Sequence, residues 1–376
     1  MARERGVYCK RMAGVYIAYP FCAQKCTFCN FASGVFPREL ERRYLAALLA
    51  EMRAHAWAWT PETVYFGGGT PSLMPIEALA GVLELVPGRP WTEATMEAAP
   101  GSITAERAAA WHELGINRVS LGVQSFVAAE LARTGRRHTP ETVAREMELL
   151  RKAGITRFNI DLIAGLPAQT VESWRESLRW VLWLAPGHVS VYMLEVDDDS
   201  RLGREIRRHG MRYGAGEAPD EDLTTTLYET AIDELARAGV RQYEISNFAR
   251  PGEESRHNLK YWKLEPYAGF GADAHSFDGK TRRANAETPA VYCERMERDG
   301  TAVTETTPAH LVEEKFLVGL RLAEGVRPST EEWERFRTPI ERFIRTGLLE
   351  ADSGALRLTR RGVLLSNEVL QEFLCP

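Results

Sequence analysis

The chain has 376 residues, and 44% of them are hydrophobic, which suits one large domain with a modest appendage and excludes a disordered chain. Its formal net charge of −5, without any long basic block, argues against nucleic acid as a principal partner. No apolar run reaches the roughly 18 residues of a membrane span, and the charged N-terminus lacks the apolar stretch of a secretory signal.

The first predicted elements are an N-terminal tail over residues 1–13 and a strand over 14–20. Directly after the strand, Cys22, Cys26 and Cys29 follow with the spacing C-x₃-C-x₂-C. The remaining cysteines are isolated: Cys9, Cys293 and Cys375. A disulfide scaffold is not expected in so long a chain, so the cluster indicates a metal site in a reducing compartment such as the cytosol.

Two kinds of metal site could use these cysteines. Zinc is the simpler one, but zinc sites usually have four ligands and paired C-x₂-C knuckles, and no fourth Cys or His lies nearby. A cluster of four irons bound by three thiolates would keep one iron without a protein ligand. That open corner could hold a small molecule, which explains why three cysteines suffice.

Helices and strands then alternate along most of the chain. Three helical runs end at Gly115, Gly154 and Gly239, and each is followed by a short apolar run rich in β-branched and aromatic residues. The predicted strands are 14–20, 63–67, 93–98, 118–123, 157–163 and 189–195. The predicted helices are 38–56, 76–85, 104–113, 140–152, 170–184 and 221–238, and residues 195–221 are expected to form an exposed loop. The α/β order predicts a parallel sheet in a full or partial (β/α)₆ barrel over residues 14–285, with a doubly wound open sheet as the alternative.

Glycines and polar residues follow the predicted strands. Gly67, Gly68 and Gly69 lie in "YFGGGTPS", where missing side chains let the backbone approach a ligand closely. Polar residues lie at or near three further strand ends: Glu97, Gln124 and Asp161. Because the active sites of barrels lie at the carboxyl ends of the strands, these residues and the cysteines are expected to line one site.

The pattern changes after about residue 285. Residues 286–376 read as helices with a short β-hairpin, which predicts a small C-terminal domain of winged-helix type. Winged helices often bind DNA, but the acidic chain favours a packing role here.

The cysteine spacing resembles that of the radical S-adenosylmethionine (radical SAM) superfamily. The resemblance implies a [4Fe–4S] cluster on Cys22, Cys26 and Cys29, with S-adenosylmethionine chelated to the open iron and cleaved reductively to a 5′-deoxyadenosyl radical. It also implies cofactor contacts at Tyr16, Phe28, Gly68, Gly69, Thr70 and Glu97. Ala18 departs from the family, which usually has His there, and Tyr19 stands where Ile is usual.

Nearly the whole chain resembles the subfamily of oxygen-independent coproporphyrinogen III oxidase and the HemW-type haem chaperones. On that basis Gln124, Arg136 and Asp161 match positions that hold a second S-adenosylmethionine in the oxidase, so one or two molecules are implied. Two features favour the chaperone type. Phe31 replaces the fourth cysteine of the oxidase motif, and only 21 residues precede Cys22, where the oxidase has a long arm.

A third feature is the segment "RHNLKYW", which resembles the H-N-x-x-Y-W segment linked to haem binding in the chaperones. The resemblance implies haem contacts at His257, Asn258, Tyr261 and Trp262, with His275 as a second candidate ligand. It further implies that the bound molecule is haem or another porphyrin. The implied recipients are haem proteins, including respiratory proteins at the membrane. The implied location of the chain is the cytoplasm or the periphery of that membrane. A homodimer is left open. The alternatives are a coproporphyrinogen III oxidase and a radical SAM methyltransferase.

Overall fold

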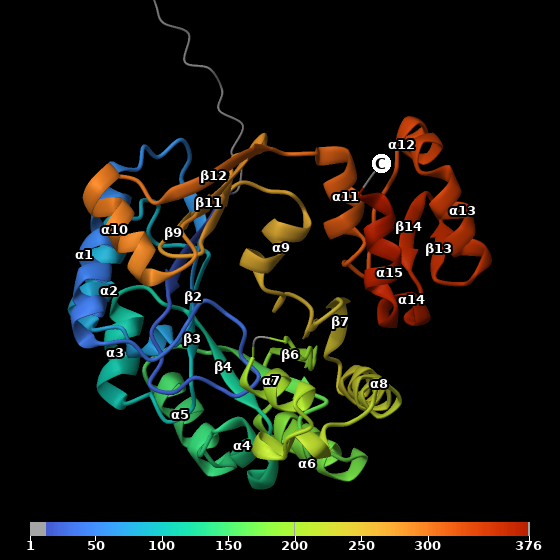
Figure 1. Cartoon of the computed structure of the whole chain (residues 1–376), viewed down its shortest axis with the longest axis horizontal. Helices are drawn as coiled ribbons and strands as arrows, with labels where there is room; N and C mark the ends of the chain where they lie inside the picture. Colours follow the sequence, from blue (N-terminus) through green and yellow to red (C-terminus); the bar gives the residue numbers. More distant parts are fainter. Residues whose placement is uncertain (1–12, 199, 375–376) are drawn as a thin grey trace, which may run out of the picture.

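The structure is a computed structural model that describes residues 13–198 and 200–374. It comprises a large curved sheet with helices along its outer side and a small C-terminal unit (Figure 1). Most of the predicted tail over residues 1–13, together with Cys9 and Cys375, lies outside the described residues.

Six parallel strands form the centre of the sheet, and they pair in chain order. They are β1 (Ala13–Tyr19), β2 (Pro61–Gly68), β3 (Glu93–Ala98), β4 (Arg118–Gln124), β5 (Arg157–Ala164) and β6 (His188–Met193). All six predicted strands are therefore confirmed, with small shifts at their ends. The parallel order brings all six carboxyl ends to one edge, where loops can meet.

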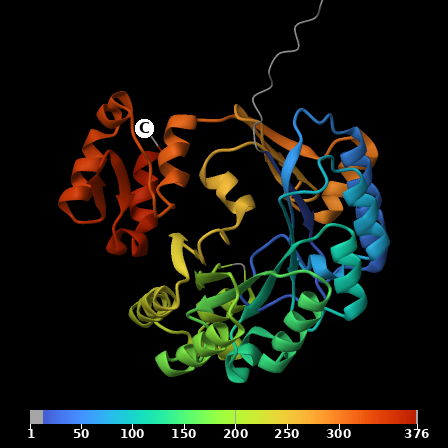
Figure 2. The same ribbon diagram turned by 180° about the vertical axis from the view of Figure 1, so that it is seen from behind.

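The helices that connect these strands run along the outer side of the sheet, as Figure 2 shows from behind. The six predicted ones are α1 (Arg38–Ala54), α2 (Ile76–Glu84), α3 (Ala105–Glu113), α5 (Pro140–Lys152), α6 (Val171–Leu184) and α8 (Glu221–Arg237). Three of them begin after a capping threonine: Thr104, Thr139 and Thr170 each accept a hydrogen bond from the backbone N–H three residues later. Between β4 and α8, two short helices were not predicted: α4 (Ala128–Thr134) and α7 (Arg201–Arg207). The latter lies in the stretch expected to be a loop.

The sheet continues on both sides of the six strands. On one side lie β9 (Tyr267–Phe270), parallel to β1, and then β10 (His275–Phe277), β11 (Thr281–Asn285) and β12 (Val303–Pro308), all antiparallel. On the other side lie β8 (Asn247–Ala249) and β7 (Arg241–Glu244), also antiparallel. The strands β12 and β7 are the two ends of the sheet order, so the barrel is partial, as predicted.

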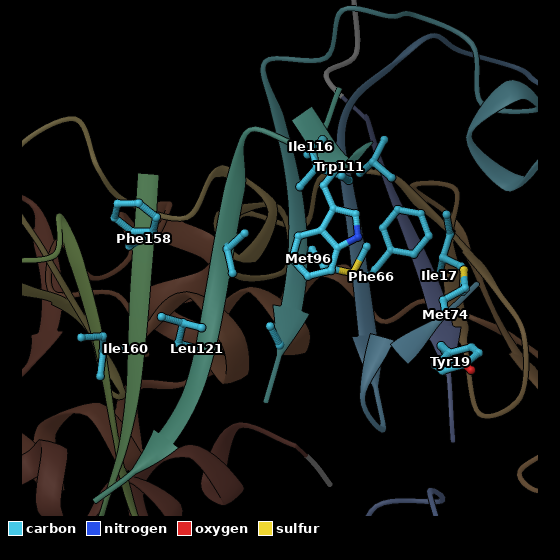
Figure 3. Packing of buried hydrophobic residues seen from close by; sticks show 14 of the residues in the cluster. Ile17, Tyr19, Phe66, Met74, Met96, Trp111, Ile116, Leu121, Phe158 and Ile160 are labelled. Atoms are coloured by element: carbon cyan, nitrogen blue, oxygen red, sulfur yellow. The ribbon is translucent and has the colours of Figure 1, made fainter. Parts of the chain in front are cut away.

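The main core lies between the sheet and its outer helices. Figure 3 shows side chains from successive strands, among them Ile17, Phe66, Met96 and Leu121, packed in one layer with Trp111 of α3. These side chains are almost completely buried. Burying each such side chain contributes about 1.5–3 kcal/mol, so this layer holds the strand ends of the site in place.

The C-terminal unit has its own core, in which Phe316, Phe336 and Phe373 contact one another. Its elements are α11 (Leu311–Gly319), α12 (Thr330–Arg335), α13 (Arg337–Arg345), β13 (Leu349–Asp352), β14 (Ala355–Leu358), α14 (Arg360–Leu364) and α15 (Ser366–Leu370). The predicted helices and hairpin are confirmed. Helix α10 (Pro289–Asp299) and β12 follow residue 285 but belong to the large core or sheet, and the domain division at residue 286 stays a prediction.

Ion pairs and backbone hydrogen bonds attach the C-terminal unit to the barrel, including one group at α8 and another near α11. Arg360 pairs with Glu229 at 3.1 Å and Asp233 at 2.8 Å, both on α8. Near α11, backbone hydrogen bonds join Ile245 N to the Arg321 carbonyl at 3.1 Å and Ala323 N to the Tyr243 carbonyl at 2.9 Å. None of the helices in the described part of the chain combines the length and apolar character of a membrane span.

Candidate functional site

The cysteine loop follows β1 and is fixed by backbone hydrogen bonds at several points. Cys22 N donates to the Gly34 carbonyl at 2.8 Å, and Gly34 N donates to the Pro20 carbonyl at 2.9 Å, which closes the loop on itself. In the middle of the loop, Thr27 N donates to the Thr134 carbonyl at 3.3 Å, and Thr27 accepts from Leu202 N at 2.9 Å. The loop is thus held by α4 and α7, two of the helices that the sequence patterns missed.

The glycine turn after β2 packs directly against the cysteine loop. Gly69 N donates to the Tyr19 carbonyl at 2.9 Å, and Thr70 N donates to the Phe21 carbonyl at 3.0 Å. A Cβ on Gly69 would lie 2.7 Å from the backbone carbon of Pro20 and 2.9 Å from Phe21 N. Only glycine fits there, so the turn has a structural reason in addition to any contact with a ligand.

One cavity of about 1190 Å³ opens at the carboxyl ends of the strands. Its lining includes the three clustered cysteines and most of the predicted contacts: Phe28, Gly68, Gly69, Thr70, Glu97, Gln124, Arg136 and Asp161. The structure therefore brings these residues together at one cavity, although Gly67 is not in its lining, and their binding roles stay a prediction. Tyr16 is not part of the lining; its ring stacks on Tyr65 with 6.2 Å between centroids.

The two predicted carboxyl groups lie on β3 and β5 in polar but enclosed surroundings. Glu97 accepts a hydrogen bond of 2.7 Å from the Tyr65 hydroxyl, and burial raises the pKa of Glu97 to about 7. Asp161 accepts from Asn159 Nδ2 at 2.6 Å and from the Ser120 hydroxyl at 3.1 Å. Burial raises the pKa of Asp161 as well, although these hydrogen bonds favour its charged form. Two desolvated acids in one cavity are suited to a cationic ligand.

Gln124 and Arg136 form another wall of the cavity. Gln124 has a φ of +71°, which is uncommon for a residue with a side chain, at an irregularity in the pairing of β4 with β5. Arg136 Nη1 donates to the Gly122 carbonyl at 2.5 Å, whereas its Nε is buried without an acceptor in the described part of the chain. A buried donor without a partner indicates room for a polar ligand or water.

The cavity also contains residues that the sequence patterns did not single out. Arg118, Ser120, His188 and Ser190 line its floor from the barrel interior. The C-terminal unit contributes Arg321 and residues 364–368. Alternation of strand residues could have placed Ser120 and Ser190 on an inner face. No local signal places residues 364–368 in the lining of this cavity, because their position depends on how the C-terminal unit packs on the barrel.

The predicted haem segment forms α9 (Arg256–Trp262), and only Asn258 of its four candidate residues lines this cavity. His257 is 1% exposed, and both ring nitrogens are hydrogen-bonded, Nδ1 to the Thr63 hydroxyl and Nε2 to the Tyr261 hydroxyl, each at 2.8 Å. Burial lowers the pKa of His257 to about 3, so the ring is neutral. As the structure stands, His257 has no nitrogen free for a metal. His275, the second candidate, lies on β10 and is exposed.

The three cysteines offer the thiolate donors that iron–sulfur clusters use. Between residues 13 and 374, with residue 199 set aside, no three Cys, His, Asp or Glu side chains converge closely enough to hold one metal ion. A cubane cluster would take each of the three thiolates on a different iron. Burial raises the pKa of the Cys22 thiol, so its thiolate would need the positive charge of a metal. Phe31, at the fourth motif position, is 66% exposed.

Ala18, which stands where the family usually has His, is closely packed on β1. It is 4% exposed, and its carbonyl accepts a hydrogen bond of 2.8 Å from the buried Tyr44 hydroxyl. A Cβ on Gly271 would lie 3.1 Å from the Ala18 Cβ. A small side chain therefore fits at this place on β1.

Two family models match the chain. The Radical SAM superfamily matches residues 16–181, which cover β1 to most of α6, and the HemN C-terminal domain matches residues 306–365. The first match contains the three cysteines and the glycine turn.

The chain is also similar over nearly its full length to curated proteins. It is 33% identical to the "Heme chaperone HemW" of Bacillus subtilis, over 96% of this chain and 99% of that protein. It is 32% identical to the Escherichia coli protein of the same name, over 96% and 97%. It is 33% identical to the mouse "Radical S-adenosyl methionine domain-containing protein 1, mitochondrial", over 96% and 87%.

Among solved structures, the chain is similar to coproporphyrinogen III oxidase (HemN) from Escherichia coli, described as a radical SAM enzyme. The TM-score is 0.83 over 97% of this chain and 90% of that one, at 21% identity. The likeness establishes the fold, including the partial barrel with its C-terminal domain.

Proposed function

This chain belongs to the HemW family within the radical SAM superfamily, and from that premise we propose that it is a haem chaperone, which binds haem and delivers it to haem proteins. The observation that carries the proposal is the full-length likeness to several proteins named for this role. The cavity with three cysteines supports it, because it retains the donor set of the superfamily.

In the proposed assignment, Cys22, Cys26 and Cys29 hold a [4Fe–4S] cluster, and S-adenosylmethionine binds at the open iron. When bound, the cluster supplies one-electron reduction. The methionine end of the cofactor would be held by Glu97 and by the backbone of Gly68, Gly69 and Thr70, with Phe28 beside it. Tyr16 does not line the cavity and would act indirectly, by packing against Tyr65. The support is the common cavity, the close-fitting glycine turn and a desolvated carboxyl that can face a cation.

A second S-adenosylmethionine is part of the proposal. Gln124, Arg136 and Asp161 would hold it. The cavity of about 1190 Å³ exceeds the roughly 300–1,000 Å³ of most small-molecule sites, which supports room for more than one ligand. The buried Arg136 Nε without an acceptor supports a polar group at this wall.

Because the pKa of Glu97 is raised to about 7, we expect the affinity for S-adenosylmethionine to depend on pH. At a pH below this pKa the Glu97 carboxyl is neutral in the empty protein. At a pH above it the carboxylate is charged and can attract the cationic cofactor. The affinity for S-adenosylmethionine of the cluster-loaded protein should therefore rise as the pH is increased from 6 to 8. Calorimetric titration should show this rise in the wild type and a flatter profile in Glu97→Gln. An equal rise in both proteins would assign the dependence to another group.

The chaperone can be distinguished from the oxidase by one paired experiment. The reconstituted protein, under anaerobic reducing conditions, should bind haem and transfer it to apomyoglobin, and should not convert coproporphyrinogen III to protoporphyrinogen IX. The reason is that Phe31 offers no thiol at the position where the oxidase motif has its fourth cysteine. Absorbance of the Soret band and chromatography of the porphyrins are the measurements.

Two other results would contradict the chaperone proposal, and each would favour a different function. Steady oxidation of coproporphyrinogen III that depends on S-adenosylmethionine would favour an oxidase. Absence of haem binding by the wild-type protein would remove the chaperone and leave a radical SAM methyltransferase as the better alternative.

Haem contact by α9 stays a prediction, at His257, Asn258, Tyr261 and Trp262. The enclosed ring of His257 makes it a poor test residue, because its removal would leave Thr63 and Tyr261 without partners whether or not haem binds there. The identity of the recipients, attachment at a membrane, a homodimer and a cytoplasmic location are also predictions, the last of them supported by the clustered thiols.

A further inference from the structure

A second cavity, of about 700 Å³, lies between the α9–β9 connection and the C-terminal unit. Figure 1 shows α9 between the sheet and α11, and the cavity is formed where the end of α9 meets α11 and the segment after it. The two cavities share no lining residue. Helix α9 contributes to both, with Asn258 in the cysteine cavity and Trp262 in the second one.

The walls of the second cavity are largely apolar. They include Trp262, Leu264, Pro266, Leu311, Leu322 and Val326. The indole of Trp262 lies under the Arg321 guanidinium, 4.6 Å from the ring centroid, and its buried Nε1 has no acceptor among the described residues. Leu311 is 44% exposed, which leaves an apolar side chain in contact with water at this cavity. An apolar ligand would cover it.

The lining is also positively charged. It has three cations, Lys263, Lys315 and Arg327, and one acid, Glu324. Lys263 pairs with Glu324 at 3.0 Å, and Lys315 pairs with Glu332 at 2.6 Å. The Arg327 guanidinium donates to the Ser353 carbonyl at 2.9 Å and has no carboxylate within ion-pair distance in the described ranges. The cavity therefore combines an apolar interior with two paired lysines and one cation, Arg327, whose charge no carboxylate of the described residues offsets.

We propose that this second cavity is the porphyrin site, with the ring against Trp262 and Leu311 and its carboxylates near Arg327 and Lys263. This inference rests on the proposed function, since haem is the flat, apolar dianion that such a protein would carry. A volume of about 700 Å³ lies within the usual range for small-molecule sites, and an interface between two folded units is a common place for them. A fatty acid has one carboxylate and no flat face, so it would use the aromatic wall and the separated cations less well.

Haem and S-adenosylmethionine would occupy different cavities on either side of α9, so that the porphyrin is held apart from the cluster. The ring and carboxylates, rather than the iron, would provide recognition, and metal-free protoporphyrin IX should bind to the same site.

Two variants test the site in the full-length, cluster-loaded protein. Leu311→Glu places a carboxylate in the apolar wall, and Arg327→Glu reverses the unpaired charge. Each should weaken binding of haem and of protoporphyrin IX by about tenfold or more, because anionic groups then face the porphyrin carboxylates. Matched controls are Val291→Glu on α10, also 44% exposed, and Arg179→Glu on α6, an exposed residue that lines neither cavity. Both controls should keep wild-type affinity, and all four variants should keep their iron and sulfide.

The outcomes separate this inference from the proposed function. If the wild type binds haem and both cavity variants bind it equally well, haem lies elsewhere and the assignment fails while the chaperone proposal stands. If palmitate displaces haem as effectively as protoporphyrin IX does, the cavity is a fatty-acid site and the assignment fails. If the wild type binds neither porphyrin, the proposed function fails with it.

Discussion

Replacing Cys22, Cys26 or Cys29 by Ala is expected to remove nearly all cluster iron from the protein. Each thiolate would hold a different iron, and the cavity lining offers no other cysteine. We expect the iron and sulfide content of each variant to fall to about a tenth or less of the wild-type value. S-adenosylmethionine affinity should fall with it, because the cofactor would lose the iron to which it is chelated. Anaerobic reconstitution followed by iron and sulfide analysis measures the effect.

The control for these variants is Cys293→Ala. Cys293 is fully buried in α10, belongs to the main core and lies outside the cysteine cavity. This variant should keep its cluster and lose only the modest stability of a small core substitution. Normal iron content in all three loop variants would place the ligands elsewhere and refute the assignment.

Gly69→Ala is expected to have the second-largest effect, although it adds only one methyl group. The new Cβ would lie 2.7 to 2.9 Å from backbone atoms of Pro20 and Phe21, and a backbone cannot rotate away as a side chain can. The glycine turn and the cysteine loop would have to separate, which breaks the hydrogen bonds at Gly69 and Thr70. We expect a loss of several kcal/mol of stability, together with weaker binding of S-adenosylmethionine.

The matched control is Gly81→Ala in α2. A Cβ there would meet only Leu49 Cδ2, at an ordinary 3.7 Å, and alanine is the better helix former by about 1 kcal/mol. The temperature of thermal unfolding should therefore fall strongly for Gly69→Ala and should not fall for Gly81→Ala. If Gly69→Ala unfolds at the wild-type temperature and binds the cofactor normally, the close contact with Pro20 and Phe21 does not require glycine at this position.

The sequence by itself determined the elements and most of the first site. The helical runs predicted six helices and the short apolar runs predicted six strands. Both kinds of pattern depend only on residues that are close together in the chain. The cysteine spacing and the strand-end residues predicted one shared site, because parallel strands bring their carboxyl ends to the same edge. The structure brings the cysteines and these residues to one cavity, apart from Gly67 and Tyr16, and their contacts with the cofactor stay a prediction.

Only the tertiary structure decided what depends on residues far apart in the chain. The helices α4 and α7 have only seven residues each, so their apolar pattern is too short to predict a helix. Their role, which is to hold the cysteine loop through Thr27, depends on how the loop packs between them. Likewise, the motif around His257 carried no sign that Thr63, far away in sequence, would occupy its ring nitrogen. The second cavity exists only because α11 and the residues after it dock beside Trp262, and such docking depends on the sum of many weak contacts that no local pattern encodes.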